Sequence, residues 1–189
     1  LTVIEKMEQK ETSDTERRFL DQFFSKIPCE ENGFKVFDYE KFCAMVLFFA
    51  HRNKELLKTK LMKLLNYSDM IFYKENGISI SGAKYVHFPY GPVPENFDIL
   101  LGTMEAGHIV HIEVSYENGY EKHQVVPECE MPEGILSEGE LEVLERICTK
   151  FAGFGSADIS NYSHKEKGYS ETKQGEIITY RYAKDIQLN

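Results

Sequence analysis

The stretch from Lys58 to Pro94 constrains the fold more than any other part of the chain. Apolar residues recur at helical spacing from Leu57 to Phe72. Asn76-Gly77 then provides a stop, because glycine tolerates the left-handed conformation that closes a helix. The lysines of this predicted helix are expected on its opposite, solvent-facing side: Lys58, Lys60, Lys63 and Lys74. In a chain with a net charge of -9, such a face favours contact with something acidic.

Tyr90-Gly91-Pro92-Val93-Pro94 predicts a stiff turn after an extended segment. Each proline fixes its own φ and favours an extended conformation for the residue before it. The turn therefore has little conformational freedom to lose on binding, and it can serve either packing or recognition. The pattern by itself favours packing. Pro94 is also expected to be the first residue of a short helix that ends at Gly102.

Other local signals predict three more helices and a hairpin. Asp38 is expected to cap a helix from Tyr39 to about His51. Asn118-Gly119 predicts the turn of a hairpin with strands 108–116 and 120–126. Residue 117 should lie opposite residue 120, which places four apolar residues on the buried face: Val110, Ile112, Val114 and Val125.

The last third of the chain carries two helix starts. Ser137 and Glu140 form a capping box at the start of a helix that runs to Gly153. Ser156 is expected to cap a short helix that runs to Tyr162. Together these elements predict an α+β fold, mainly helical, with a small antiparallel β-sheet or hairpin.

Residues 1–35 are predicted to form an N-terminal helical arm or connector, and residues 36–189 the main domain. One apolar stripe in the arm is stopped by Pro28 and has to dock on something: Phe19, Leu20, Phe23, Phe24 and Ile27. It can dock on its own domain, or residues 15–27 can form a homodimer contact or connect to a missing N-terminal module. The segment from Cys29 to Gly33 is interpreted as a linker.

Charge and cysteine content narrow the class of protein. The acidic balance argues against direct nucleic-acid contact by this segment, because phosphate binding needs clustered Lys and Arg. No apolar run is long enough to cross a membrane. The four cysteines are widely spaced and form no C-x-x-C pair, which favours a cytoplasmic protein without disulfides.

The histidines do not predict a metal centre. His108, His111 and His123 fall on a hairpin, where residues three apart on one strand point to opposite faces. No cofactor is expected either. Gly153-Phe154-Gly155-Ser156 lacks the G-K-[ST] ending of a phosphate loop and is better explained as a helix stop.

His164 and Glu166 form the one pair of residues that suggests acid–base chemistry. No nucleophile and no second acid pair lies near them in the sequence. A histidine that fixes the loop after the short helix is the favoured interpretation, so we do not expect an enzyme.

Three motifs in register resemble the SocA-like antitoxin family, whose domain is also called Panacea. The first is Lys60-Leu61, Lys63-Leu64-Leu65 and Tyr67, the second is Tyr90–Val93, and the third is the segment from Ser156 through His164 and Glu166. The family usually has tryptophan where this chain has Tyr169, and many members carry another before the turn, where this chain has Tyr85–Pro89. The resemblance extends from about Phe37 to Leu188 and looks closest to members fused behind an MqsA-type zinc-finger and helix-turn-helix module.

This resemblance implies an antitoxin of a prophage-associated toxin–antitoxin system that neutralises its cognate protein toxin by direct contact. The residues it implies for partner binding are Lys60, Lys63, Tyr67, Tyr90, Gly91, Pro92, Val93, His164, Glu166 and Tyr169. Two alternatives stay open at this point. The protein could be a protease adaptor that delivers a toxin for degradation, or the C-terminal part of a DNA-binding transcriptional regulator.

Overall fold

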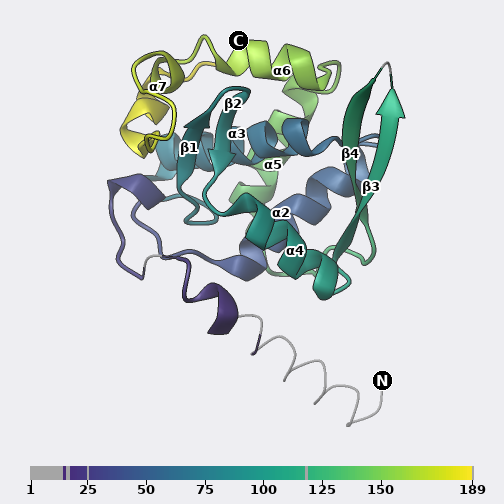
Figure 1. Ribbon diagram of the computed structural model, residues 1–189. Coiled ribbons are helices and arrows are strands. Elements are labelled where there is room, and N and C mark those ends of the chain that lie inside the picture. The colour runs from purple at the N-terminus through teal and green to yellow at the C-terminus, as the bar shows by residue number, and fades with distance from the viewer. Residues whose placement is uncertain (1–14, 16–17, 25, 118, 189) are drawn as a thin grey trace.

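The computed structural model describes residue 15 and residues 18–24, 26–117 and 119–188 (Figure 1). Its elements follow one another as η1 (Glu30–Asn32), α2 (Tyr39–Arg52), α3 (Lys58–Asn76), β1 (Tyr85–Phe88), β2 (Gly91–Pro94), α4 (Phe97–Ala106), β3 (Val110–Glu117), β4 (Tyr120–Pro127), α5 (Glu138–Lys150), α6 (Ser156–Ser163), α7 (Lys167–Ser170) and η2 (Tyr180–Asp185). Helices dominate, and the strands form two separate antiparallel pairs. The predicted α+β class is confirmed.

Helix α3 passes through the centre of the domain and contacts α2, α5, α6, β2 and η2 (Figure 1). It ends where the sequence predicts, at Gly77, whose φ of 75° lies in the left-handed region. The predicted lysine surface is wrong for two of its four residues: Lys74 is exposed and Lys58 is half-buried, but Lys60 and Lys63 are only 8% and 0% exposed. Other elements pack over the side of α3 that carries these two lysines. The spacing of apolar residues within one helix does not show which elements pack against it.

The segment predicted as a stiff turn is a strand. Gly91–Pro94 forms β2 and pairs with β1 in the register Phe88↔Gly91 to Tyr85↔Pro94, so the turn itself is Pro89-Tyr90. Pro94 therefore does not begin a helix. Helix α4 begins at Phe97 and continues past Gly102 to Ala106, because Thr103 and Met104 are buried and extend its apolar side.

The second hairpin has the predicted register, with Glu117 opposite Tyr120. Val110 and Val125 are buried as predicted, but Val114 on the same face is 50% exposed. The free end of β3–β4 extends away from the helices (Figure 1). Only the other end of the hairpin packs on the core, so the apolar face is not covered along its whole length. The prediction that Val114 is buried is therefore wrong.

Helix caps agree with the sequence at two of three positions. The Asp38 carboxylate accepts a hydrogen bond from Lys41 N at 3.1 Å, and Ser137 and Glu140 form the predicted capping box. Ser156, however, is the first residue of α6 and does not cap it. The Asp158 carboxylate instead accepts from Gly155 N at 3.0 Å, which leaves the Ser156 hydroxyl without a capping role.

The arm docks in part on its own domain. Leu20 is buried, and the Phe24 ring stacks on Phe37 with 4.0 Å between ring centroids. Helical structure ends at Leu20, earlier than predicted, and Phe19 and Phe23 are exposed. The segment interpreted as a linker contains η1, and its Asn32 is buried and accepts from the Ser79 hydroxyl at 2.8 Å. Residues 1–14, 16, 17 and 25 of the predicted arm lie outside the described residues.

Candidate functional site

The three sequence motifs come together beside the middle of α3. Tyr67 of α3 donates a hydrogen bond from its hydroxyl to Glu166 Oε1 at 3.2 Å. Gly91 of β2 lies against Lys63 of α3 and Ser163 of α6, since a Cβ on Gly91 would lie 2.6 Å from Lys63 Cε and 2.4 Å from Ser163 Oγ. Residues that are far apart in the sequence are thus packed into one cluster.

Lys63 is the most unusual member of this cluster. Its side chain is fully buried, and its Nζ has no hydrogen-bond partner among the residues that the structure describes. Removing an ammonium group from water disfavours its charged form. Burial accordingly lowers the pKa of Lys63 to about 7. A neutral amine at this position can pack beneath β2 as a long, mainly aliphatic side chain.

Tyr67 and Glu166 form the next layer. The Tyr67 ring is buried against Phe151, with 4.9 Å between ring centroids. Burial raises the pKa of the Tyr67 phenol, and the neighbouring Glu166 raises it further, so Tyr67 stays a hydrogen-bond donor. Burial also raises the pKa of Glu166, and the hydrogen bond from Tyr67 lowers it in part. The pair ties the loop after α6 to α3.

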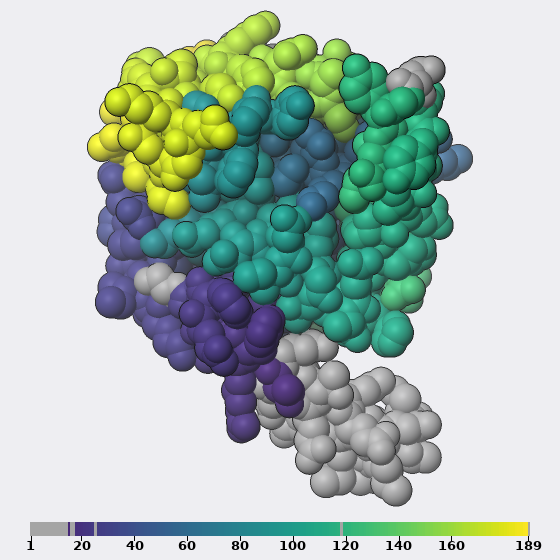
Figure 2. Space-filling model, viewed as in Figure 1, coloured from purple at the N-terminus to yellow at the C-terminus, as the bar shows by residue number. Residues whose placement is uncertain are grey.

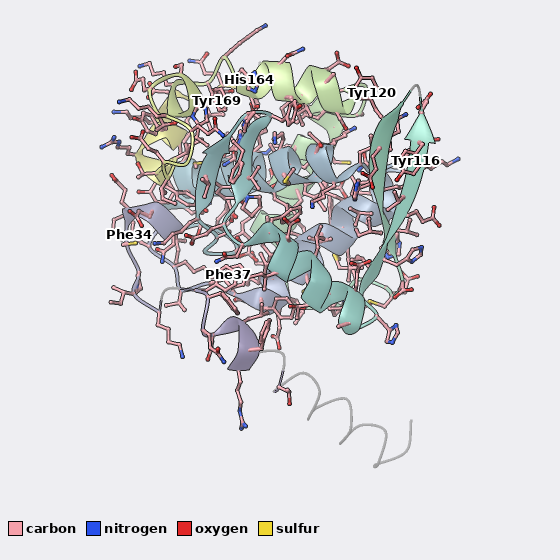
Figure 3. The ribbon with its side chains drawn as sticks, in the orientation of Figure 1. Phe34, Phe37, Tyr116, Tyr120, His164 and Tyr169 are labelled. Atoms are coloured by element: carbon pink, nitrogen blue, oxygen red, sulfur yellow. The ribbon has the colours of Figure 1, made fainter. Side chains whose placement is uncertain are left out.

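Tyr169 connects that loop to the β1–β2 turn. Its ring is stacked between His87 and His164, with centroid distances of 3.8 Å and 4.3 Å. Its hydroxyl hydrogen is shared between the carbonyl oxygens of Phe88 and Pro89, which lie 3.1 Å and 3.2 Å from the hydroxyl oxygen. Figure 3 shows His164 and Tyr169 close together at the end of the domain where this turn lies. The contacts position the turn.

Asp69 is a central residue that the sequence analysis missed. It is fully buried, and its carboxylate accepts hydrogen bonds from Ile80 N, Ser81 N, the Ser81 hydroxyl and the Tyr85 hydroxyl. Burial raises the pKa of Asp69, and these donors lower it in part. A signal was present, because Asp69 lies four residues after Leu65 on the apolar stripe of α3.

A groove of about 790 Å³, here called the hairpin groove, lies next to this cluster. Its floor is the first turn of α3, and its walls are the outer face of the β1–β2 hairpin and the start of α4. The side chains that define the hairpin groove are Lys58, Met62, Val86, Phe88, Tyr90, Val93, Glu95, Phe97, Asp98 and Ile99. Figure 2 shows this side of the molecule, with blue atoms of α3 visible between the teal β1–β2 hairpin and the green β3–β4 hairpin.

The predicted partner-binding residues separate into two groups. Tyr90 is 72% exposed and Val93 is half-buried, and both line the hairpin groove. The other eight do not line it. Lys60, Lys63, Tyr67, Gly91 and Pro92 are buried, and His164, Glu166 and Tyr169 are half-buried. Phe88 and Phe97, which the sequence analysis did not select, complete the apolar lining.

The part of the chain that the structure describes contains no candidate metal site and no candidate membrane-spanning helix. Within residues 15, 18–24, 26–117 and 119–188, no three His, Cys, Asp or Glu side chains are grouped as metal ligands. Over the same residues, no helix has the length and apolar character needed to span a bilayer.

Comparisons with known proteins agree with the three motifs. No curated protein and no solved structure matches the chain. The model of the family described as "Antitoxin SocA-like, Panacea domain" matches residues 61–169, which is more than half of the 189 residues. The match contains the core of α3, both hairpins, and the loop with His164 and Glu166. The chain therefore belongs to the SocA-like antitoxin family and carries its Panacea domain.

Proposed function

We propose that this domain is an antitoxin that neutralises a partner protein toxin by direct contact, and that the hairpin groove is the contact surface. Family membership supports the general role. The single observation that carries the assignment of the surface is the exposure of Phe88 and Tyr90, 46% and 72%, at the rim of an apolar groove. Exposed aromatic side chains gathered at a concave surface are typical of protein–protein binding.

The buried motif residues act as a support for this surface. The turn that presents Tyr90 is held by the Tyr169 hydroxyl, whose one hydrogen is shared between the Phe88 and Pro89 carbonyl oxygens. Beneath it, Gly91 packs on Lys63, and Tyr67 holds Glu166. A preformed surface loses less conformational entropy on binding than a loop that has to become ordered. Neutralisation in this proposal is a binding event in the cytoplasm and requires no catalysis.

Co-expression tests the proposal. The full-length gene is expressed together with the product of each adjacent open reading frame, and growth and co-purification are scored. We expect one neighbouring product to be toxic alone, and growth to be restored when the antitoxin is present. The pair should co-purify with the toxin intact. Loss of the toxin only in a protease-competent host would instead favour the adaptor role, and no rescue by any pair would contradict the antitoxin proposal.

The arm supports a separate proposal of a homodimer contact through residues 15–27. Phe19 and Phe23 stack with 5.2 Å between centroids and are 46% and 38% exposed, whereas Leu20 is already used for docking on the domain. Sedimentation of the wild type and of Phe19→Ser/Phe23→Ser tests this contact. A monomeric wild type would contradict it.

A further inference from the structure

We propose that the occupant of the hairpin groove is an amphipathic helix of the partner, with an apolar face flanked by Lys or Arg. This inference rests on the proposed function, and it names the kind of partner segment that the groove accepts. It is supported by three features: the edges of the β1–β2 hairpin, the lining of the groove, and the charges at its mouth.

The hairpin cannot readily take an added strand at either edge. The backbone N–H and C=O groups of successive β1 residues point to opposite edges of the strand. Those of Tyr85 and His87 point to the segment 175–178: Ile178 N donates to Tyr85 O, and His87 N donates to Glu176 O. One edge is therefore already occupied. The backbone groups of Val86, Phe88 and Lys84 point to the other side, where β2 lies, and Glu95 N donates to Lys84 O at 2.8 Å.

It follows that Gly91, Val93 and Glu95 use their backbone groups toward β1. The residues of β2 that face its outer edge are then Pro92 and Pro94, which have no N–H group. A strand added there would find carbonyl acceptors but no donors, and it would form only part of a ladder. A helix satisfies its backbone hydrogen bonds internally and needs only side-chain contacts.

The groove lining fits such a helix. Val86, Phe88 and Val93 alternate with inward-facing residues of the hairpin and form one apolar wall, with Met62 in the floor and Phe97 and Ile99 opposite. This lining accepts the i, i+3, i+4 and i+7 side chains of an apolar helix face. Exposed Tyr90 at the rim can add apolar area together with a hydrogen-bonding hydroxyl.

The acidic side chains of the groove favour a helix with basic residues beside its apolar face. Glu95 and Asp98 lie in the groove lining, and Lys58, which also lines the groove, is paired with Asp98. The Asp98 side chain is still 87% exposed, so it remains available to a second cation. The chain as a whole carries a net charge of -9. An acidic helix would be repelled at the mouth, whereas Lys or Arg beside the apolar face would be attracted.

A displayed library of random peptides of about 15 residues, a length that can form a helix in a groove, tests the inference. The library is selected on the wild-type protein, and the enriched peptides are synthesised and titrated. We expect apolar residues at helical spacing with Lys or Arg beside them, and helical circular dichroism on binding.

Tyr90→Ala should weaken binding by about tenfold, as for an aromatic hot spot. The matched control Tyr120→Ala removes an equally exposed tyrosine, 77% exposed, from the other hairpin and should leave binding unchanged.

Charge reversal supplies the second control. Asp98→Lys should weaken binding of the basic peptides, with a smaller salt dependence, whereas Glu130→Lys changes an exposed carboxylate outside the groove and should have no effect. Enrichment of proline-rich, strand-forming or acidic peptides, binding that ignores Tyr90→Ala, or no enrichment at all would overturn the inference. Growth rescue that survives Tyr90→Ala and Asp98→Lys would overturn the groove as the toxin site while leaving the antitoxin role intact. Selected helices without any rescue would contradict the antitoxin role alone.

Discussion

Gly91 packs directly on Lys63: a Cβ added to this glycine would lie 2.6 Å from Lys63 Cε. Its φ of 103° is also one that residues with a Cβ rarely adopt. Gly91→Ala should therefore lower the free energy of unfolding by about 3 kcal/mol, from backbone strain and a steric clash together. Urea unfolding followed by circular dichroism measures the loss.

Gly134→Ala is the matched control for this substitution. Gly134 has a φ of 77°, but an added Cβ would meet no heavy atom of the described residues within 4 Å. Gly134→Ala should lower the free energy of unfolding by about 1 kcal/mol, which is the cost of placing a residue with a Cβ in the left-handed conformation. Equal losses in the two variants would show that the contact with Lys63 does not constrain β2.

Lys63 should make stability depend on pH. Its folded pKa of about 7 lies below the ordinary value of 10.5, so the unfolded chain holds the proton more tightly than the folded protein does. The free-energy cost of burying the protonated Lys63 is largest below about pH 7. The free energy of unfolding rises as pH increases from about 7 toward 10.5. Between about pH 7 and pH 9 the increase should be roughly 2 kcal/mol.

Lys63→Met should remove this increase and raise stability at neutral pH, because the methionine has no proton to lose on folding. Unfolding free energies at several pH values test the expectation. Lys173→Met, at an exposed lysine, should keep the wild-type pH dependence. Parallel pH profiles for the wild type and Lys63→Met would argue that Lys63 is solvated or paired in solution.

Several local signals predicted their elements correctly, but those at Ser156 and Pro94 did not. The capping box of Ser137 and Glu140, and the pairing of Glu117 with Tyr120, follow from residues only a few positions apart. Both features depend on short-range sequence patterns, so they could be predicted from the sequence alone.

The candidate site depends on contacts that the sequence does not display. Lys63 is buried because β2 packs over its side of α3, although lysines on a helix normally suggest a solvated face. Pro94 satisfies the rule for a first helical residue, but pairing with Tyr85 places it in β2. The hairpin groove joins residues from α3, β1, β2 and α4, and only the three-dimensional arrangement brings Met62 near Phe97.

Asp69→Ala should be one of the most destabilising substitutions in the domain. It would leave the Ile80 and Ser81 N–H groups and two hydroxyls without their acceptor in a fully buried position. Unpaired buried donors make the expected loss about 3–5 kcal/mol. Asp98→Ala removes an exposed carboxylate and should cost less than about 1 kcal/mol. Thermal unfolding of both variants gives the comparison, and similar midpoints would contradict a structural role for Asp69.

Tyr169→Phe tests whether the Tyr169 hydroxyl positions the β1–β2 turn independently of its effect on the free energy of unfolding. The variant keeps the ring between His87 and His164 but loses the one hydroxyl hydrogen that the Phe88 and Pro89 carbonyls share. Since these carbonyls can turn to water, the free energy of unfolding should fall by only about 1 kcal/mol. Amide hydrogen exchange should rise selectively around Tyr90, and growth rescue in the co-expression assay should weaken. Tyr116→Phe, at an exposed tyrosine of the other hairpin, should change neither measurement. Unchanged exchange at Tyr90 in Tyr169→Phe would show that the turn holds its shape without this hydroxyl.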